Sequence, residues 1–100
     1  MIRHIVMWRV KGTDAMERTE ARELVKAEFE SLRGRIPGLK HLEVGLDTSG
    51  IDYACDVVLI TDFESQDALD AYASHPEHHR VRDKLTGLRI TRHQVDYIAE

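Results

Sequence analysis

Alternation of apolar and polar residues marks the first segment of the chain. Residues 2–10 are rich in β-branched and large apolar side chains, which favour a pleated strand. The even-numbered positions are almost wholly apolar, and the odd-numbered ones are apolar at the centre, at Ile5 and Met7. We therefore predict a strand that buries both faces, with the even face, which carries Trp8, turned toward the helices.

The pattern then becomes helical. Asp14 and Glu17 have the spacing of a capping box, although Thr13 is also a possible cap. Charged side chains fill one side of the following segment, and the apolar residues recur at three- and four-residue steps on the other, so an amphipathic helix is predicted from residue 14 to residue 33. Its stop signals are Gly34, Pro37 and Gly38. The predicted buried stripe consists of Ala21, Leu24, Val25, Phe29, Leu32 and Ile36.

Two further strands are predicted after this helix. Residues 39–47 alternate between apolar and polar positions, which is typical of an edge strand with one face in water. After a turn at residues 48–50, residues 53–63 are apolar on both faces and predict a buried central strand. Cys55 falls on that strand beside Val57.

The rest of the chain predicts a broken helix and a last strand. Ser65 can cap a short helix, and Pro76 can start another, because the N–H that proline lacks is unpaired at a first helical position anyway. Gly87 ends the second helix, and residues 89–98 form the last strand. The expected buried positions of the two helices are Ala68, Leu69, Tyr72, Val81 and Leu85.

The element order defines a fold class. It reads β-α-β-β-α-β with the second helix broken, which predicts an α+β, ferredoxin-like antiparallel sheet with helices on one face. Right-handed crossovers place the first and third strands at the centre. The 100 residues are expected to form one domain.

The central strands also predict an assembly. The helices of one chain can cover only one face of the sheet, yet both central strands are apolar on both faces. Leaving Ile5, Met7, Val58 and Ile60 in water would expose a patch larger than soluble monomers usually carry. A second sheet from a second copy would cover it, so we expect a homodimer through the sheet face and a dimeric α+β barrel.

Composition narrows the function classes. The chain is 42% hydrophobic and 32% charged, which is typical of a soluble globular protein, and its net charge of −4 disfavours a nucleic-acid partner. No apolar run approaches the roughly 20 residues of a membrane span, and the N-terminus lacks the zones of a signal peptide. The single cysteine excludes an internal disulfide, so a cytoplasmic location is expected.

One local charge cluster departs from the acidic average. Five basic residues fall within thirteen positions, with only Asp83 against them. They are Arg80, Arg82, Lys84, Arg89 and Arg92. Such a cluster is a solvated or interface face, or alternatively an anion site.

Four segments in chain order resemble the stress-responsive A/B barrel (Dabb) domain family. They are residues 2–8 (IRHIVMW), 36–39 and 42–45 (IPGL, LEVG), 68–78 (ALDAYASHPEH) and 95–97 (VDY). The resemblance spans essentially the whole chain and implies dimeric α+β barrels in which two ferredoxin-like sheets meet. It therefore agrees with the dimer predicted from patterning.

The same resemblance implies candidate site residues. The family includes plant stress-responsive proteins and a polyketide cyclase in which a tyrosine and histidines act on a linear polyketide. Tyr72 and His78 match its working pair in their spacing from the His-Pro element, and His4 matches its first-strand histidine. Another histidine of the cyclase falls where this chain has Cys55, so the site is incomplete here.

The residues themselves allow two interpretations. His78 shares a helical stripe with Val81 and should point inward, where it can act as a general base while Tyr72 donates a hydrogen bond to a substrate carbonyl. In the second interpretation, both side chains simply pack, and His75 caps the helix. In either case we expect a small, mostly apolar pocket bordered by the candidate catalytic residues His4, Tyr72 and His78 and by Trp8, Cys55, His75 and Val81.

The function classes that remain are a binding protein and an enzyme. The first is a homodimer that binds a small apolar or keto-containing molecule without turnover. The second is a cofactor-independent cyclase-like lyase or isomerase that uses His78 and Tyr72. His75, His78 and His79 can supply two metal ligands, but no third ligand stands at a recognised spacing, so neither a metal nor another cofactor is expected.

Overall fold

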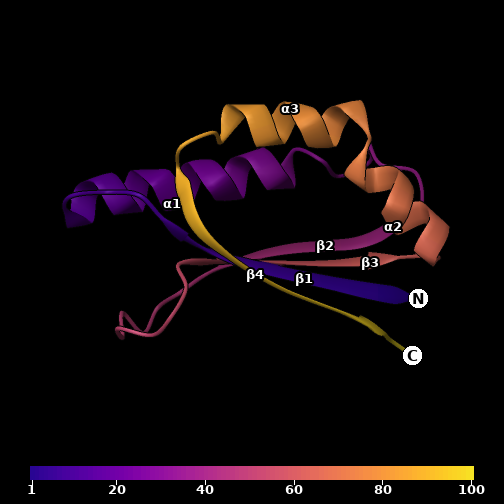
Figure 1. Cartoon of the computed structure of the whole chain (residues 1–100), viewed down its shortest axis with the longest axis horizontal. Coiled ribbons are helices and arrows are strands. Elements are labelled where there is room, and N and C mark those ends of the chain that lie inside the picture. The colour runs from indigo at the N-terminus through magenta and orange to yellow at the C-terminus, as the bar shows by residue number, and fades with distance from the viewer.

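Four strands and three helices follow one another along residues 1–100 of the computed structural model (Figure 1). The order is β1 (Ile2–Val10), α1 (Ala15–Glu30), β2 (Leu39–Leu46), β3 (Val57–Phe63), α2 (Gln66–Ala73), α3 (Pro76–Lys84) and β4 (Arg89–Ile98). This order confirms the predicted α+β arrangement with its broken second helix. None of the helices has the length and apolar composition that crossing a bilayer requires.

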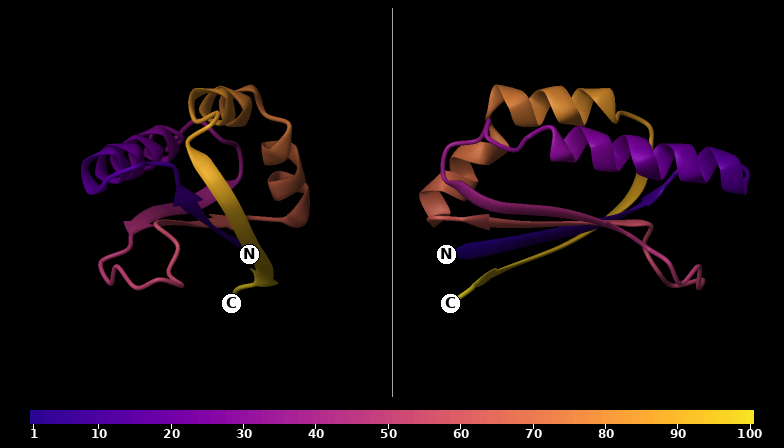
Figure 2. Two further views of the ribbon diagram at one scale, coloured as in Figure 1. Left: turned by 60° about the vertical axis from the view of Figure 1, so that its left-hand side comes forward. Right: turned by 180° about the vertical axis from the view of Figure 1, so that it is seen from behind.

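The strands form one antiparallel sheet in the order β2-β3-β1-β4, with β1 and β3 at the centre as predicted. All three helices lie on the same side of this sheet (Figures 1 and 2). The even-numbered face of β1 meets them, because Val6, Trp8 and Val10 are buried. The core therefore lies between the sheet and the helices.

Side-chain caps fix where each helix begins. The Asp14 carboxylate accepts a hydrogen bond from the Glu17 N–H, and the Ser65 side chain accepts one from the Ala68 N–H. Both caps were predicted, and each satisfies an amide that lacks a partner within the helix. At α3 the cap is His75, whose ring accepts from the Glu77 N–H.

Two details of the prediction are wrong. The first helix ends at Glu30 rather than residue 33, and Leu24 is 43% exposed instead of lying in the buried stripe. The third strand begins at Val57 rather than residue 53, and Tyr53 is 84% exposed. In the loop before β3, the Ala54 N–H donates to the Ile51 carbonyl at 3.1 Å, which closes a turn where the early strand was expected.

The outer face of the sheet has no cover within the chain (Figure 2). Pairing aligns Ile5 with Ile60 on one side and with Val95 on the other, and Met7 with Val58 in the neighbouring row. Val95 is half-exposed, and the other four are partly exposed. This is the apolar surface that, according to the sequence pattern, the helices of one chain cannot cover.

Candidate functional site

The edge strand β4 makes one wall of two adjoining clefts. Its helix-side residues Arg92, Gln94 and Asp96 pair with buried β1 residues, yet they remain exposed because no helix covers this edge of the sheet. Helices α2 and α3 form the opposite wall. Side chains that reach toward each other across this gap are therefore accessible to a small molecule.

The first cleft, which we call the histidine cleft, has a volume of about 240 Å³. Its lining includes the three residues that the sequence identified as candidate catalytic groups, His4, Tyr72 and His78. They come from β1, α2 and α3, so the folded chain brings together positions that are far apart in sequence.

Tyr72 lies between the two histidines. Its ring centroid is 4.6 Å from that of His78 and 6.4 Å from that of His4, with edge-on geometry in both pairs. Tyr72 is buried and lines the cleft, and its hydroxyl makes no intrachain hydrogen bond. Burial raises the pKa of Tyr72 to about 12, against a smaller lowering effect of Arg89 and Arg92, so the hydroxyl stays protonated and can donate.

His78 is held in its neutral form. Burial lowers its pKa, and the positive charges of Arg82 and Arg89 and the neighbouring His79 lower it further, while the backbone of Ala73 acts weakly in the opposite direction. Its Nδ1 atom is buried without a hydrogen-bond partner. The imidazolium would place an unpaired N–H there, which is costly in a buried position. At neutral pH the ring is therefore uncharged, and one of its two nitrogens keeps a free lone pair.

His4 is oriented by a residue that sequence reasoning did not identify. Its Nδ1 lies 2.6 Å from the Asp96 carboxylate, across the β1–β4 pairing. The carboxylate accepts a hydrogen bond from Nδ1–H, which leaves Nε2 as the acceptor of the ring. The partner of one ring nitrogen commonly sets the role of the other in this way. The only signal that could have predicted this contact is the antiparallel register of β1 and β4, which pairs His4 with Asp96.

The second cleft, which we call the arginine cleft, adjoins the first at His78 and Arg92 and has a volume of about 430 Å³. Trp8 and Phe29 form its floor as a stacked pair with centroids 5.0 Å apart. The Arg89 guanidinium lies above both rings, 5.1 Å from the Trp8 centroid and 5.6 Å from the Phe29 centroid. This arrangement fixes a cation beside His78.

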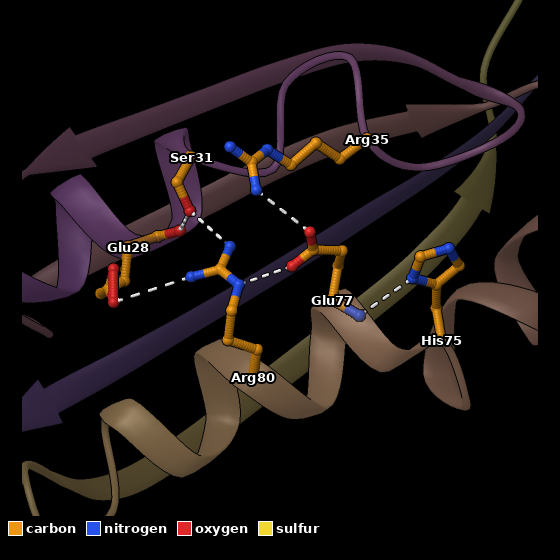
Figure 3. Close-up of polar contacts among 6 residues, drawn as sticks. All are labelled: Glu28, Ser31, Arg35, His75, Glu77 and Arg80. Atoms are coloured by element: carbon orange, nitrogen blue, oxygen red, sulfur yellow. Dashed lines mark hydrogen bonds and ion pairs between the residues drawn. The ribbon is translucent and has the colours of Figure 1, made fainter.

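Ion pairs between α1 and α3 hold the wall that carries His78 (Figure 3). Arg80 donates to the Glu77 carboxylate at 2.5 Å and to the Ser31 hydroxyl at 2.9 Å, and it lies 3.9 Å from Glu28. Arg35 donates to the other oxygen of Glu77 at 3.1 Å. These contacts tie α3 to the end of α1, and His78 on the same helix lines both clefts.

The other expected pocket residues lie apart from the two clefts or beneath them. Val81 is completely buried in the core, and His75 is engaged as the cap of α3. Cys55 borders a different hollow of about 220 Å³, together with Met7 and Val58. The three histidines considered for a metal do not assemble, since no group of three potential ligands lies close enough to hold an ion.

The largest hollow of the surface is elsewhere. It has a volume of about 690 Å³ and lies between the start of α1 and the loop at residues 47–56. None of the predicted site residues lines it. The histidine and arginine clefts are the better candidate, because they combine accessible volume with polar and charged groups that converge.

The fold and these clefts define a small ferredoxin-like α+β protein with a cleft lined by His4, Tyr72 and His78 at the edge of its sheet. Residues 2–99 match the family described as the stress responsive A/B barrel domain, Dabb. The chain belongs to this family, as its sequence motifs indicated.

Solved structures agree with this assignment. A dimeric ferredoxin-like protein of unknown function from Bacteroides fragilis is 27% identical, with a TM-score of 0.84 over 96% of this chain and 93% of that chain. One from Thermobifida fusca, also dimeric and of unknown function, is 26% identical, with a TM-score of 0.82 over 98% and 90%. The hydroxynitrile lyase of Passiflora edulis shares the fold at 16% identity, with a TM-score of 0.80 over 99% and 93%. No curated protein matches the chain.

Proposed function

We propose that this chain acts as a homodimer whose subunits each bind a small carbonyl compound along β4. The observation that carries this proposal is the position of Tyr72, a buried ring with a free, protonated hydroxyl between two histidines in an open cleft. A hydroxyl with no partner in the chain is suited to donate to a ligand carbonyl. The adjoining aromatic floor of Trp8 and Phe29 offers an apolar environment for the rest of the ligand.

The homodimer part of the proposal rests on the uncovered sheet face. Two related structures are dimeric, and the outer face here carries a continuous apolar row through Ile60, Ile5 and Val95. A second copy would bury this row and place Cys55 near the interface rather than in the ligand site. The cytoplasmic location inferred from the single cysteine remains a prediction.

A second candidate function, cofactor-independent lyase or isomerase chemistry, is favoured by the neutral state of His78. A base at this position can remove a proton from the carbon next to a bound carbonyl, and the electron pair moves to the carbonyl oxygen. Tyr72 then donates to the developing enolate. Return of the proton from His78 to another atom completes an isomerisation. Alternatively, the enolate carbon attacks a second carbonyl of the same ligand and closes a ring, and the alkoxide formed from that carbonyl takes the proton back from His78.

Proton exchange can test both functions. Acetophenone is a suitable probe because its methyl protons exchange slowly with D2O, and NMR reports binding and exchange in one sample. We expect binding to shift the Tyr72 and His78 resonances in the wild type. Catalysis additionally predicts accelerated exchange, which His78→Ala abolishes and Tyr72→Phe reduces, while His79→Ala retains it.

The two functions give different results in that experiment. Binding without accelerated exchange supports the binding protein and rejects the base role of His78. If acetophenone, cyclohexanone and pentane-2,4-dione all leave the Tyr72 and His78 resonances unchanged, the carbonyl site itself is rejected.

A further inference from the structure

The arginine cleft differs in charge from the rest of the chain. The chain carries a net charge of −4, but this cleft is lined by Arg82, Arg89 and Arg92 and by no aspartate or glutamate. Arg82 is paired with the Asp83 carboxylate at 3.3 Å, but Arg89 and Arg92 are two cations without a carboxylate, and together they produce a local positive potential. The cleft is therefore suited to an anionic group rather than to a neutral ligand alone.

Two of these arginines are the exceptions among all the arginines of the chain. Every other arginine donates a hydrogen bond to an oxygen atom of the protein. Neither Arg89 nor Arg92 makes a hydrogen bond or an ion pair through its side chain, although Arg89 is half-buried. Burying a cation without a partner is costly, and burial together with Arg92 indeed lowers the pKa of Arg89. An incoming anion would supply the missing partner.

Cation–π contacts hold the Arg89 guanidinium without using its N–H donors in a hydrogen bond. The group lies over the Trp8 and Phe29 rings, so the ring faces contribute a cation–π contact. The N–H groups lie in the guanidinium plane and remain available. A planar fork of this kind matches the two oxygens of a carboxylate, and it also binds phosphate oxygens.

The position of this cation relates it to the site already described. His78 and Arg92 border both clefts. A ligand whose carbonyl meets Tyr72 can thus extend past His78 toward Arg89. Its anionic end would then be separated from its carbonyl by a distance of the order of one ring or a short chain.

We propose that the natural ligand carries an anionic oxygen group, a carboxylate or a phosphate, which Arg89 and Arg92 bind in the arginine cleft. This inference rests on the proposed carbonyl site and specifies its ligand as a keto acid or a keto phosphate. It assigns Arg89 and Arg92, the two members of the basic cluster that lie on β4, to ligand recognition rather than to a merely solvated surface.

The test uses matched probes on the full chain. Benzoate, phenyl phosphate and neutral benzamide share a ring and differ in their polar group, and Trp8, the only tryptophan, reports binding through its fluorescence. We expect benzoate or phenyl phosphate to bind at least about tenfold more tightly than benzamide, which corresponds to one charge-assisted hydrogen bond. The tighter of the two anions identifies the group as carboxylate or phosphate.

Variants separate the cleft from general electrostatics. Arg92→Gln should weaken anion binding about tenfold and leave benzamide unchanged. Arg89→Lys keeps the charge but loses the fork, so it should weaken benzoate more than benzamide. Lys84→Gln removes a nearby charge outside the cleft and should have little effect. Equal affinity for benzamide and both anions in the wild type, or equal losses in Arg92→Gln and Lys84→Gln, would overturn the anion site.

The outcome is independent of the carbonyl test. Acetophenone and cyclohexanone have no charged group. Their effect on the Tyr72 and His78 resonances therefore does not depend on an ionic contact with Arg89. If they bind and the anions show no preference, the carbonyl site stands and the anion site fails. If neither kind of probe binds, both proposals fail.

Discussion

Asp96 and His4 form a 2.6 Å hydrogen bond between adjacent antiparallel strands, at the edge of the histidine cleft. The carboxylate is partly exposed and the imidazole is buried, so the exposed partner determines the orientation of the buried one. Gln94 donates to the second oxygen of Asp96 at 3.1 Å and restrains it further. Strand β4 therefore contributes to the site through Asp96 as well as through its arginines.

Asp96→Ala should reduce both stability and ligand binding. The substitution leaves the Nδ1–H of His4 buried without an acceptor, which costs about 1–3 kcal/mol in the free energy of unfolding. Denaturant unfolding measures that loss, and ¹⁵N NMR should show that His4 no longer has one preferred tautomer. Gln94→Ala, the control, removes only an outer contact and should cost less than about 1 kcal/mol. Equal losses in the two variants would contradict the orienting role of Asp96.

The register of α3 provides a second prediction. Val81 is completely buried and Arg82 is exposed on the next position of the same helix. Val81→Asp places an unpaired charge in the core and should cost more than about 3 kcal/mol, whereas Arg82→Asp should change stability by less than about 1 kcal/mol. Thermal or urea unfolding of the two variants checks this difference. Similar losses would show that α3 does not present His78 to the cleft.

Local patterns were enough to predict most of the fold. The two-residue period of β1, the caps Asp14 and Ser65, and proline at the start of α3 each determine structure through neighbours in sequence, and all were found as predicted. The strand predicted from residue 53 was wrong because Tyr53 and Cys55 imitate the alternation of a strand, whereas a backbone hydrogen bond from Ala54 to Ile51 closes a turn there.

The candidate site was less predictable because it depends on register between distant segments. Sequence motifs identified His4, Tyr72 and His78, but nothing near Asp96 indicates that it faces His4. In the same way, the basic cluster was visible in sequence, whereas its contact with Trp8 and Phe29 depends on how β4 pairs and how α1 packs. A shift of one residue in β4 would have turned these side chains to the other face of the sheet.

The lowered pKa of His78 predicts a pH dependence of stability. The unfolded chain takes up a proton on this residue near its ordinary pKa of about 6.5, whereas the folded chain does so only at lower pH. The contribution to stability is therefore fully present above about pH 6.5 and is lost as pH falls from there through the folded pKa. His78→Gln should flatten the pH dependence of the melting temperature in this range. His41→Gln, at an exposed histidine on β2 outside both clefts, serves as the control. Parallel pH profiles for wild type and His78→Gln would contradict the buried, neutral assignment.

The proposed homodimer gives the last prediction. Ile5 lies at the centre of the outer face, where it pairs with Ile60 on β3 and Val95 on β4. In a single chain its side chain remains partly exposed. If a second sheet covers this face, Ile5→Asp inserts a charge into the apolar interface and should convert the dimer to monomer. Sedimentation at micromolar concentration should give twice the chain mass for the wild type and the mass of one chain for Ile5→Asp. Glu43→Lys changes a charge in the same row on the edge strand β2, where Glu43 is exposed, and should retain the dimer. A wild type that sediments as a stable monomer would refute the homodimer, since the apolar row through Ile5 would then be tolerated in water.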